Sequence, residues 1–311
     1  MKSVQMSSYG HANVLSYAEQ AIPEPKSRDV LVKVHAVAVN PFDIKLMEGM
    51  YKENIPQKFP LTIGGDFAGE VIGTGERVRT LSSGMKVFGS ALAFTGASGA
   101  LAEYVTVNEE KVAPMPPFLK YDTAASFITP GCAAQQAVNW NMNVKPGEKV
   151  LIHGGAGAVG AIAIQICHNI GAQVAVTVSN DDIPYMKELG VDLIINYHLQ
   201  PFENVVHEFD AVLDTQGGEV LARSCQVLKP GGIVVSLVSV PDPELLSRYK
   251  IRGMFQNTVI STDTLKTLGF LIEENIIRPY DIIKVPFDQC IEAIDSKIRG
   301  NIPGKIVIKL S

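Results

Sequence analysis

The chain has 311 residues, of which 46% are hydrophobic, and its formal net charge at pH 7 is −5. This length and composition predict two domains with well-filled cores and exclude a disordered chain. The acidic balance provides no general field for nucleic acid or an anionic membrane, so we expect neither as a partner.

The first third of the chain has the pattern of antiparallel strands. Residues 30–39 alternate and are rich in valine, which is typical of a half-buried strand. Residues 67–72 and 86–89 are further strand candidates between glycine-rich turns, and residues 99–107 predict a loop that leads into a strand. The proline-rich residues 113–117 predict a break in regular structure and a linker.

From residue 122 onward, short apolar strands alternate with helices. Helices are predicted at 121–140, 158–170, 182–189, 219–228 and 262–274, and strands at 149–153, 173–178, 193–195, 210–214, 233–237 and 305–310. This α/β alternation predicts a doubly wound parallel sheet with both faces covered. We expect a nucleotide-binding domain at 122–261, inserted into a β-rich domain formed by 1–121 and completed by 262–311.

A glycine loop connects the predicted strand 149–153 to the predicted helix 158–170. Gly155, Gly157 and Gly160 fit the spacing G-x-G-x-x-G, which allows a tight turn, close approach of a pyrophosphate and close packing of helix on strand. The free N–H groups at the start of the helix favour phosphate. The residues predicted to bind a dinucleotide are Gly154, Gly155, Ala156, Gly157, Ala158, Val159 and Gly160.

The end of the predicted strand 173–178 bears on the choice of cofactor. Domains that bind NAD usually place Asp or Glu there to bind the ribose 2′-hydroxyl, whereas this chain has Ser179, which leaves room for a 2′-phosphate. Asp181 and Asp182 argue the other way, although Asn180 or Asp181 is also a plausible cap for the following helix. We expect NADPH rather than NADH.

Several motifs occur in one order along the whole chain. They are residues 39–45 (VNPFDIK), 64–69 (GGDFAG), 84–89 (GMKVFG), 102–105 (AEYV), the glycine loop, 214–218 (DTQGG) and 304–307 (GKIV). On these motifs the chain resembles the zinc-independent quinone oxidoreductases of the medium-chain dehydrogenase/reductase superfamily.

The resemblance implies a GroES-like, partly open β-barrel as catalytic domain, an inserted Rossmann domain and an active site in the cleft between them. It implies that Tyr197 contacts the cofactor phosphate, that Thr215 belongs to the cofactor site, and that Asn40 lies near the nicotinamide. It also implies a homodimer. The loop expected to approach the nicotinamide with main-chain groups consists of Leu237, Val238 and Ser239.

The resemblance also addresses metal binding. Zinc-dependent members have Cys where this chain has Asn40 and His where it has Gly65, and neither residue here offers the thiolate or imidazole that zinc prefers. The four cysteines form no C-x-x-C pair and the six histidines show no metal-binding spacing, so we expect no metal and a reducing, cytoplasmic compartment. Without a Lewis acid, the easier acceptors are quinones and α,β-unsaturated carbonyl compounds.

Two further residues are candidates for catalysis. Tyr51 matches the proton donor of the related enoyl-thioester reductases, but it is alternatively a pocket or packing residue. Asp43 is either catalytic or makes a structural hydrogen bond. The sequence therefore predicts NADPH-dependent, zinc-free hydride transfer to a quinone or enone. The alternatives are a 2-enoyl thioester reductase with Tyr51 as proton donor, and a non-catalytic protein that binds NADPH.

Overall fold

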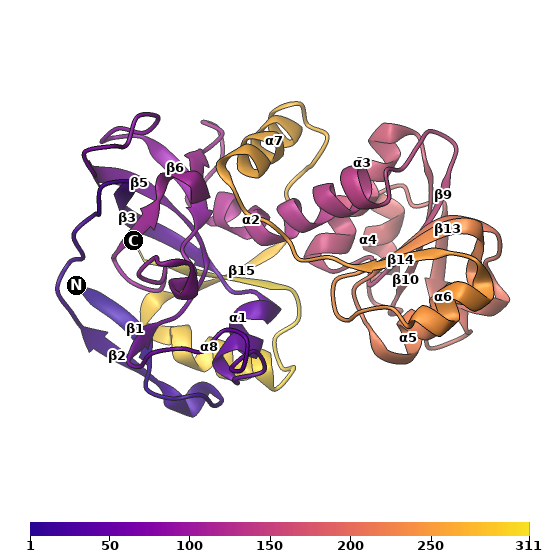
Figure 1. Cartoon of the computed structure of the whole chain (residues 1–311), viewed down its shortest axis with the longest axis horizontal. Coiled ribbons are helices and arrows are strands. Elements are labelled where there is room, and N and C mark those ends of the chain that lie inside the picture. Colours follow the sequence, from indigo (N-terminus) through magenta and orange to yellow (C-terminus); the bar gives the residue numbers. More distant parts are fainter. Residues whose placement is uncertain (311) are drawn as a thin grey trace. The chain divides into compact units, whose positions relative to one another are not determined.

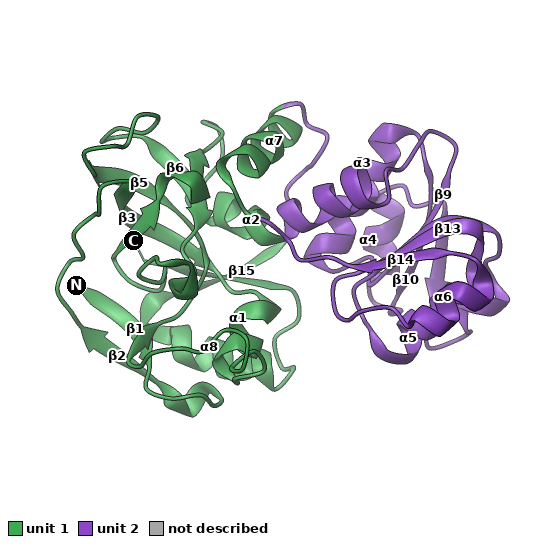
Figure 2. Cartoon of the chain, viewed as in Figure 1, with its two compact units in different colours: residues 1–129, 260–273, 281–311 green, residues 130–259, 274–280 purple. Residues whose placement is uncertain are grey.

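The computed structural model describes residues 1–310, which form two compact units (Figures 1 and 2). Unit 1 comprises residues 1–129, 260–273 and the C-terminal segment from residue 281, and unit 2 comprises residues 130–259 and 274–280. Within the described residues, no helix is both long and apolar enough to cross a membrane.

Unit 1 is built on a seven-stranded sheet in the order β15-β16-β3-β5-β6-β8, with β7 also paired to β3. These strands are β3 (Asp29–Ala38), β5 (Asp66–Thr74), β6 (Lys86–Ser90), β7 (Tyr104–Asn108), β8 (Val112–Pro114), β15 (Ile282–Pro286) and β16 (Lys305–Lys309). A smaller antiparallel sheet has the order β2-β1-β4 and consists of β1 (Lys2–Met6), β2 (Leu15–Glu19) and β4 (Leu61–Thr62).

Strand β3 lies at the centre of the larger sheet, where it pairs with β16, β5 and β7. Its alternating valines are buried. Val30, Val32 and Val34 have almost no exposed surface and pack with the other strands of the unit. The C-terminal strand β16 pairs antiparallel with β3, with Val307 opposite Ala38. The C-terminal strand therefore belongs to the same sheet as the strands of the β-rich front.

The helices of unit 1 cover parts of these sheets. They are α1 (Pro41–Met47), α7 (Thr262–Glu273), α8 (Cys290–Ile298) and the first part of α2 (Tyr121–Gln135). Helix α1 begins at Pro41, whose missing N–H is no loss in a first turn, and the Asp43 carboxylate accepts the N–H of Asn40 at 2.8 Å.

Unit 2 holds a six-stranded parallel sheet in the order β11-β10-β9-β12-β13-β14. Its elements are β9 (Lys149–His153), α3 (Ala158–Ile170), β10 (Gln173–Val178), α4 (Ile183–Glu188), β11 (Leu193–Asn196), β12 (Phe209–Asp214), α5 (Gly218–Ser224), β13 (Leu228–Ser236), α6 (Pro243–Tyr249) and β14 (Arg252–Phe255). This order reverses between β9 and β12, as in dinucleotide-binding folds. The predicted doubly wound sheet is confirmed.

Short helices fill several connections. A π-helix, η4 (Gln136–Asn141), extends α2, and the 3₁₀ helices are η1 (Ala12–Val14), η2 (Ala93–Thr95), η3 (Glu109–Lys111), η5 (Phe202–Asn204), η6 (Cys225–Val227) and η7 (Phe287–Gln289).

Some local predictions are wrong. Residues 113–117 were expected to lack regular structure, but Ala113 and Pro114 end strand β8, which pairs with β6 at the edge of the sheet. An edge strand accommodates proline because its N–H need not join the ladder. The helix after β10 begins at Ile183, so Asp182 rather than Asn180 or Asp181 occupies the N-cap position of α4, and its side chain makes no capping hydrogen bond.

Candidate functional site

The glycine loop of unit 2 joins β9 to α3, and the geometry explains its glycines. Gly154 has a φ of +69°, in the left-handed region that glycine adopts without strain. A Cβ on Gly160 would overlap the carbonyl oxygen of Gly154, and a Cβ on Gly155 would lie 2.8 Å from the Cβ of Val176. Gly155 and Gly160 are thus required by close packing, and Ala156 lies half-buried in the turn between them.

Gly157 has a different environment. A Cβ there would touch only the carbonyl oxygen of Gly154, at 3.3 Å, and would otherwise project into open space. Gly157 is also the N-cap of α3, and no side chain of the described residues caps that helix. The N–H groups of Ala158, Val159 and Gly160 therefore have no partner inside the helix. A pyrophosphate fits this position, where the free donors and the positive end of the helix dipole meet.

Two of the predicted phosphate-contacting residues lie next to each other in unit 2. Val178 of β10 is paired with Asn196 of β11, so Ser179 and Tyr197 follow at adjacent strand ends. The Tyr197 N–H donates to the carbonyl oxygen of Val178 at 3.2 Å, and its side chain is 53% exposed. The Ser179 hydroxyl donates to the Asp182 carboxylate at 2.6 Å. An acidic group therefore stands beside Ser179, which the sequence argument treated as open space for a phosphate.

The loop of residues 237–239 has its main-chain donors already in use. The N–H of Leu237 donates to the carbonyl oxygen of Asp214 at 2.9 Å, and the N–H groups of Val238 and Ser239 donate to the Ser236 hydroxyl at 3.1 and 3.3 Å. No group among residues 1–310 donates to the three carbonyl oxygens of the loop. The loop therefore offers acceptors rather than donors.

Thr215 and Ala133 have structural contacts in the same unit. The Thr215 hydroxyl donates to the carbonyl oxygen of His153 at 2.8 Å, which connects the end of β12 to the end of β9. The carbonyl oxygen of Ala133 accepts the Nε2–H of Gln256 at 3.0 Å, and the Gln256 Oε1 accepts from Asn141 at 2.7 Å. Gln256 is buried and was not singled out from the sequence.

Unit 1 contains a buried polar cluster centred on Asn40. The Asn40 Oδ1 accepts a hydrogen bond from the Lys305 ammonium, and its Nδ2 donates to Asp66 at 2.8 Å. Asp66 also accepts the N–H and the hydroxyl of Thr129, each at 2.8 Å. Asp43 accepts the Asn40 N–H. The cluster therefore joins α1, β5, α2 and β16.

Burial and hydrogen bonding determine which side chains of the cluster are charged. Burial raises the pKa of Asp43 to about 7, raises the pKa of Asp66 and lowers the pKa of Lys305. Asp66 accepts three hydrogen bonds that stabilise its ionised form, whereas Asp43 is hydrogen-bonded only by the main chain and the side chain of Asn40 within the described residues. We therefore assign the negative charge to Asp66, facing the Lys305 ammonium, and the proton near neutral pH to Asp43. The cluster then has no net charge, as burial favours.

Three aromatic rings lie close together in unit 1. The rings of Phe42 and Tyr51 stack with centroids 5.3 Å apart, and the rings of Phe42 and Phe94 lie 6.0 Å apart. Phe94 is 38% exposed. Phe42 follows Asn40 by two residues at the start of α1, so Tyr51 packs beside the helix turn that bears the cluster. The Tyr51 hydroxyl makes no hydrogen bond within the described residues.

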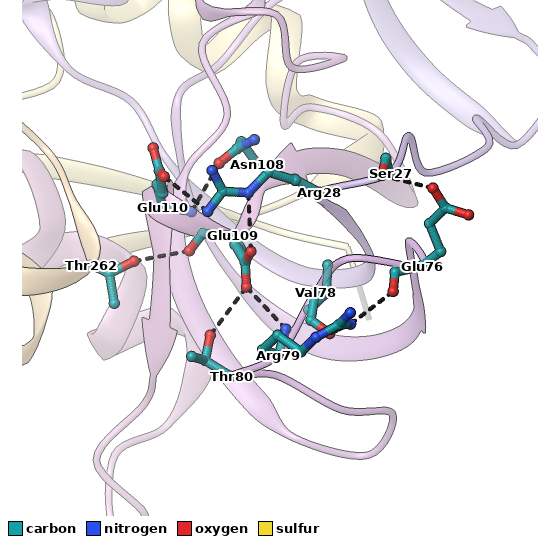
Figure 3. A network of polar contacts seen from close by, with 10 residues as sticks. All are labelled: Ser27, Arg28, Glu76, Val78, Arg79, Thr80, Asn108, Glu109, Glu110 and Thr262. Carbon is teal, nitrogen blue, oxygen red and sulfur yellow. Dashed lines mark hydrogen bonds and ion pairs between the residues drawn. The ribbon is translucent and has the colours of Figure 1, made fainter.

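A cavity of about 670 Å³ in unit 1 is lined mainly by arginine and glutamate side chains. Figure 3 shows the buried Glu109 carboxylate there, which accepts from the Arg28 Nε at 3.4 Å and from the Thr80 hydroxyl at 3.3 Å. The Thr262 hydroxyl donates to the Glu109 carbonyl oxygen at 2.8 Å, where α7 begins. These contacts connect loops to α7, and we assign them a structural role.

The comparisons with known proteins agree with this architecture. The family described as "Alcohol dehydrogenase GroES-like domain" matches residues 26–117, and "Zinc-binding dehydrogenase" matches residues 189–308. A 2-methylene-furan-3-one reductase of Solanum lycopersicum is 34% identical, over 99% of this chain and 79% of that protein. A chloroplastic NADPH-dependent alkenal/one oxidoreductase of Arabidopsis thaliana is 30% identical, over 99% of this chain and 79% of that protein. The solved structure of a quinone oxidoreductase from Coxiella burnetii is 32% identical, with a TM-score of 0.90, and covers 100% of this chain and 99% of that chain.

The chain belongs to the quinone oxidoreductase family of the medium-chain dehydrogenase/reductase superfamily. This confirms the resemblance found in the sequence, and it confirms the Rossmann and GroES-like domains.

One of the two matched families is described as zinc-binding. The residues at the two zinc-ligand positions, Asn40 and Gly65, therefore decide whether this chain could hold zinc there. Gly65 has no side chain to bind zinc, and a Cβ there would lie 2.7 Å from the Leu92 Cδ2, so any side chain at this position would require Leu92 to move. Asn40 is committed to Asp66 and Lys305. Within residues 1–310, no three His, Cys, Asp or Glu side chains lie close enough to hold a metal ion. These residues do not fit a zinc site.

Sequence reasoning placed Asn40 and Asp43 in the site but missed three members of their cluster. Asp66 and Lys305 each lie inside a motif that carried the resemblance, so a signal for both was present. Thr129 lies outside these motifs, so nothing in the sequence pointed to it. The structure brings Asn40 and Asp43 together, whereas the catalytic and binding roles of the predicted residues stay predictions.

Proposed function

We propose that this protein is an NADPH-dependent reductase that transfers hydride, without a metal ion, to quinones or α,β-unsaturated carbonyl compounds. The observation that carries the proposal is the start of α3, where free N–H groups and the open space beside Gly157 fit a dinucleotide pyrophosphate. The acceptor class is supported by two relatives, which are named as reductases of a 2-methylene-furan-3-one and of alkenals and enones.

Unit 2 would hold the cofactor. A nicotinamide carboxamide has an NH₂ donor, and the main-chain carbonyl oxygens of residues 237–239, whose N–H groups are already bonded, are complementary to it. The name of the Arabidopsis relative supports NADPH, while the carboxylate of Asp182 beside Ser179 would repel a 2′-phosphate. We propose NADPH as the cofactor, and a substitution of Asp182 tests this repulsion.

Unit 1 would supply the groups that act on the acceptor. Bound NADPH supplies the hydride, and its addition to a conjugated carbon leaves negative charge on the carbonyl oxygen of the substrate. The neighbouring carbon then needs a proton, and the candidate donor is the hydroxyl of Tyr51, which has no hydrogen-bond partner among residues 1–310. Phe42 and Phe94 give Tyr51 an apolar flank suited to a flat, conjugated molecule.

The decisive experiment measures NADPH oxidation with a panel of a quinone, a short conjugated enone, a saturated ketone and an enoyl thioester. We expect turnover with the quinone or the enone and little with the ketone. Preference for the thioester would support the alternative of an enoyl thioester reductase. Tight NADPH binding without oxidation by any acceptor would support the non-catalytic alternative, and either result would overturn the proposal.

The cofactor preference is tested separately by fluorescence titration. We expect NADPH to bind at least tenfold more tightly than NADH. Asp182→Asn should strengthen the binding of NADPH further and leave that of NADH nearly unchanged, because it removes a negative charge beside the proposed 2′-phosphate. If the variant weakens only NADH binding, Asp182 holds the ribose hydroxyl and NADH is the cofactor.

We also propose that the protein forms a homodimer and that it acts in the cytoplasm. Strand β14 is an edge of the parallel sheet and offers unpaired main-chain groups to a second copy. The Arabidopsis relative is named as chloroplastic, whereas we propose the cytoplasm for this chain. Light scattering of the purified protein gives the assembly size directly.

A further inference from the structure

The cavity of unit 1 that contains Glu109 has no role in the proposed function (Figure 3). Its volume of about 670 Å³ lies in the range of small-molecule sites. The lining carries only charged and hydroxyl-bearing side chains, which are Arg28, Arg77, Arg79, Thr80, Glu109, Glu110 and Thr262. A ligand that fits this space must therefore be polar or charged.

The carboxylate of Glu109 is already satisfied by three donors (Figure 3). It accepts from the Arg28 Nε at 3.4 Å, from the Thr80 hydroxyl at 3.3 Å and from the main-chain N–H of Arg79 at 3.3 Å. Arg28 also pairs with Glu110, at 3.0 Å. One guanidinium therefore serves both carboxylates of the lining, and within residues 1–310 neither of the other two arginine side chains pairs with them.

The side chains of Arg77 and Arg79 leave most of their donors free. In the part of the chain that the structure describes, the Arg77 guanidinium makes no hydrogen bond or ion pair. The Arg79 Nη1 donates to the carbonyl oxygens of Glu76 and Val78 at 2.7 and 3.1 Å, while its Nε and Nη2 have no partner among the same residues. Because a guanidinium carries five N–H donors, most donors of these two groups are available to a ligand.

The main chain fixes where these two arginine side chains begin. The N–H of Arg77 donates to the carbonyl oxygen of Ser27 at 2.8 Å, and the N–H of Arg79 donates to the Glu109 carboxylate. Val78, between the two arginines, is buried, whereas both arginines are exposed. The guanidinium groups therefore extend from an anchored segment toward the surface of the unit.

The lining contains more positive than negative charge. It has three guanidinium groups and two carboxylates. Glu76 lies close by, but its carboxylate accepts from the Ser27 hydroxyl at 3.1 Å and does not line the cavity. The ion pair of Glu110 with Arg28 joins two exposed side chains, and such a pair contributes little stability. An incoming anion can therefore displace Glu110 from Arg28 at little cost.

We propose that this cavity binds a phosphate group. Guanidinium groups pair with phosphate oxygens through parallel N–H donors. The three guanidinium groups come from two segments, since Arg28 directly precedes β3 whereas Arg77 and Arg79 follow β5. A tetrahedral phosphate offers oxygens in several directions and meets such a set better than a carboxylate, which has two oxygens in one plane. The volume of the cavity leaves room for a small organic group attached to the phosphate.

The test titrates ¹⁵N-arginine-labelled protein with glycerol phosphate and follows the Nε–H signals of the arginines by NMR. The signals of Arg77 and Arg79 are identified by their absence in Arg77→Met and Arg79→Met. Arg299, an exposed arginine of unit 1 paired with Asp295, is the control. We expect the two signals to shift to saturation while that of Arg299 stays constant. Equal shifts with sodium chloride at the same ionic strength, or no shift, would overturn the proposal.

Two substitutions should change the affinity in opposite directions, measured through the Arg79 signal. Arg77→Met should weaken binding about tenfold or more, which is the size of a hydrogen bond to a charged group. It leaves no residue of the described chain without its partner, so the fold should be retained. Glu110→Gln should strengthen binding by up to about fivefold, because it removes a competing carboxylate. Arg299→Met should bind as wild type, and unchanged affinity in Arg77→Met would contradict the assignment.

Three further titrations define the ligand. Succinate also carries two negative charges, and we expect it to bind at least fivefold more weakly than glycerol phosphate; equal binding would refute a phosphate site. Inorganic phosphate that binds as tightly as glycerol phosphate assigns the free ion, and tighter binding of glycerol phosphate assigns an ester, so both results support the site. Uncharged glycerol should cause no shift, and a shift to saturation with it would refute recognition of the phosphate. None of these readouts uses enzyme activity, so they do not depend on the proposed function.

Discussion

His153 at the end of β9 provides the sharpest prediction about pH and stability. Its Nε2 lies 2.9 Å from the Ser224 hydroxyl, which itself donates to the Val220 carbonyl oxygen at 2.7 Å. The serine proton is therefore used, so the His153 Nε2 must carry a hydrogen and donate it. The Nδ1 lies 3.0 Å from the Thr177 hydroxyl and must accept from it. The imidazole is neutral in this arrangement, and a second proton on Nδ1 would break the hydrogen bond that the Thr177 hydroxyl donates to it.

The size of the effect follows from the pKa of His153. Burial lowers this pKa from 6.5 to about 4, so the unfolded chain binds a proton that the folded protein excludes between these values. Stability from the neutral imidazole is complete above pH 6.5 and is lost as the pH falls toward 4. At 1.36 kcal/mol per unit, the loss amounts to about 3 kcal/mol.

The assay compares the urea unfolding of wild type and His153→Gln at several pH values between 7 and 4.5. The chain has a single tryptophan, Trp140, which lies in unit 2 together with His153, so its fluorescence reports on the unit concerned. The variant is less stable at pH 7 because it loses the edge-on contact of His153 with Phe202. Its disadvantage should shrink by about 1 kcal/mol per pH unit below pH 6.

The matched control is His198→Gln, which removes an exposed histidine of the same unit and should follow the wild type. If the stability difference between wild type and His153→Gln is the same at pH 7 and pH 4.5, the buried imidazole is not held neutral. The tautomer and the pKa argument would then both be wrong.

Three further predictions concern the two candidate sites. Tyr51→Phe should lower kcat for the enone about tenfold or more, as loss of a general acid does, with Tyr17→Phe as control; a change in KM alone would make Tyr51 a binding residue. Gly157→Ala should keep the stability of the fold but weaken NADPH binding, measured by titration, because its Cβ enters open space. Gly160→Ala should lose about 1–3 kcal/mol in urea unfolding because its Cβ meets backbone, and equal stability of the two variants would contradict this. Asp43→Asn should gain stability over wild type by up to about 1.4 kcal/mol per pH unit as the pH rises from 4 to 7, where the raised pKa of Asp43 costs the folded state; a constant difference in unfolding would place the proton elsewhere.

Local constraints explain what the sequence predicted well. The glycine loop was found because Gly154, Gly155 and Gly160 are each required by contacts or by a backbone angle within a short stretch. The strand 173–178 and the helix 158–170 agree with β10 and α3 because their patterns are long and continuous. Helix α1 was missed, since seven residues behind a proline form no clear periodic pattern.

Contacts between distant residues explain what was missed. Lys305 and Asn40 are 265 positions apart, and only the register of β16 on β3 brings them together. The sequence shows that Asp182 follows Ser179 closely, but the 2.6 Å contact between the two side chains depends on where α4 begins. The sequence predicted the N-cap of this helix one or two residues too early. Strand register and helix start are tertiary outcomes that single-sequence patterns do not define.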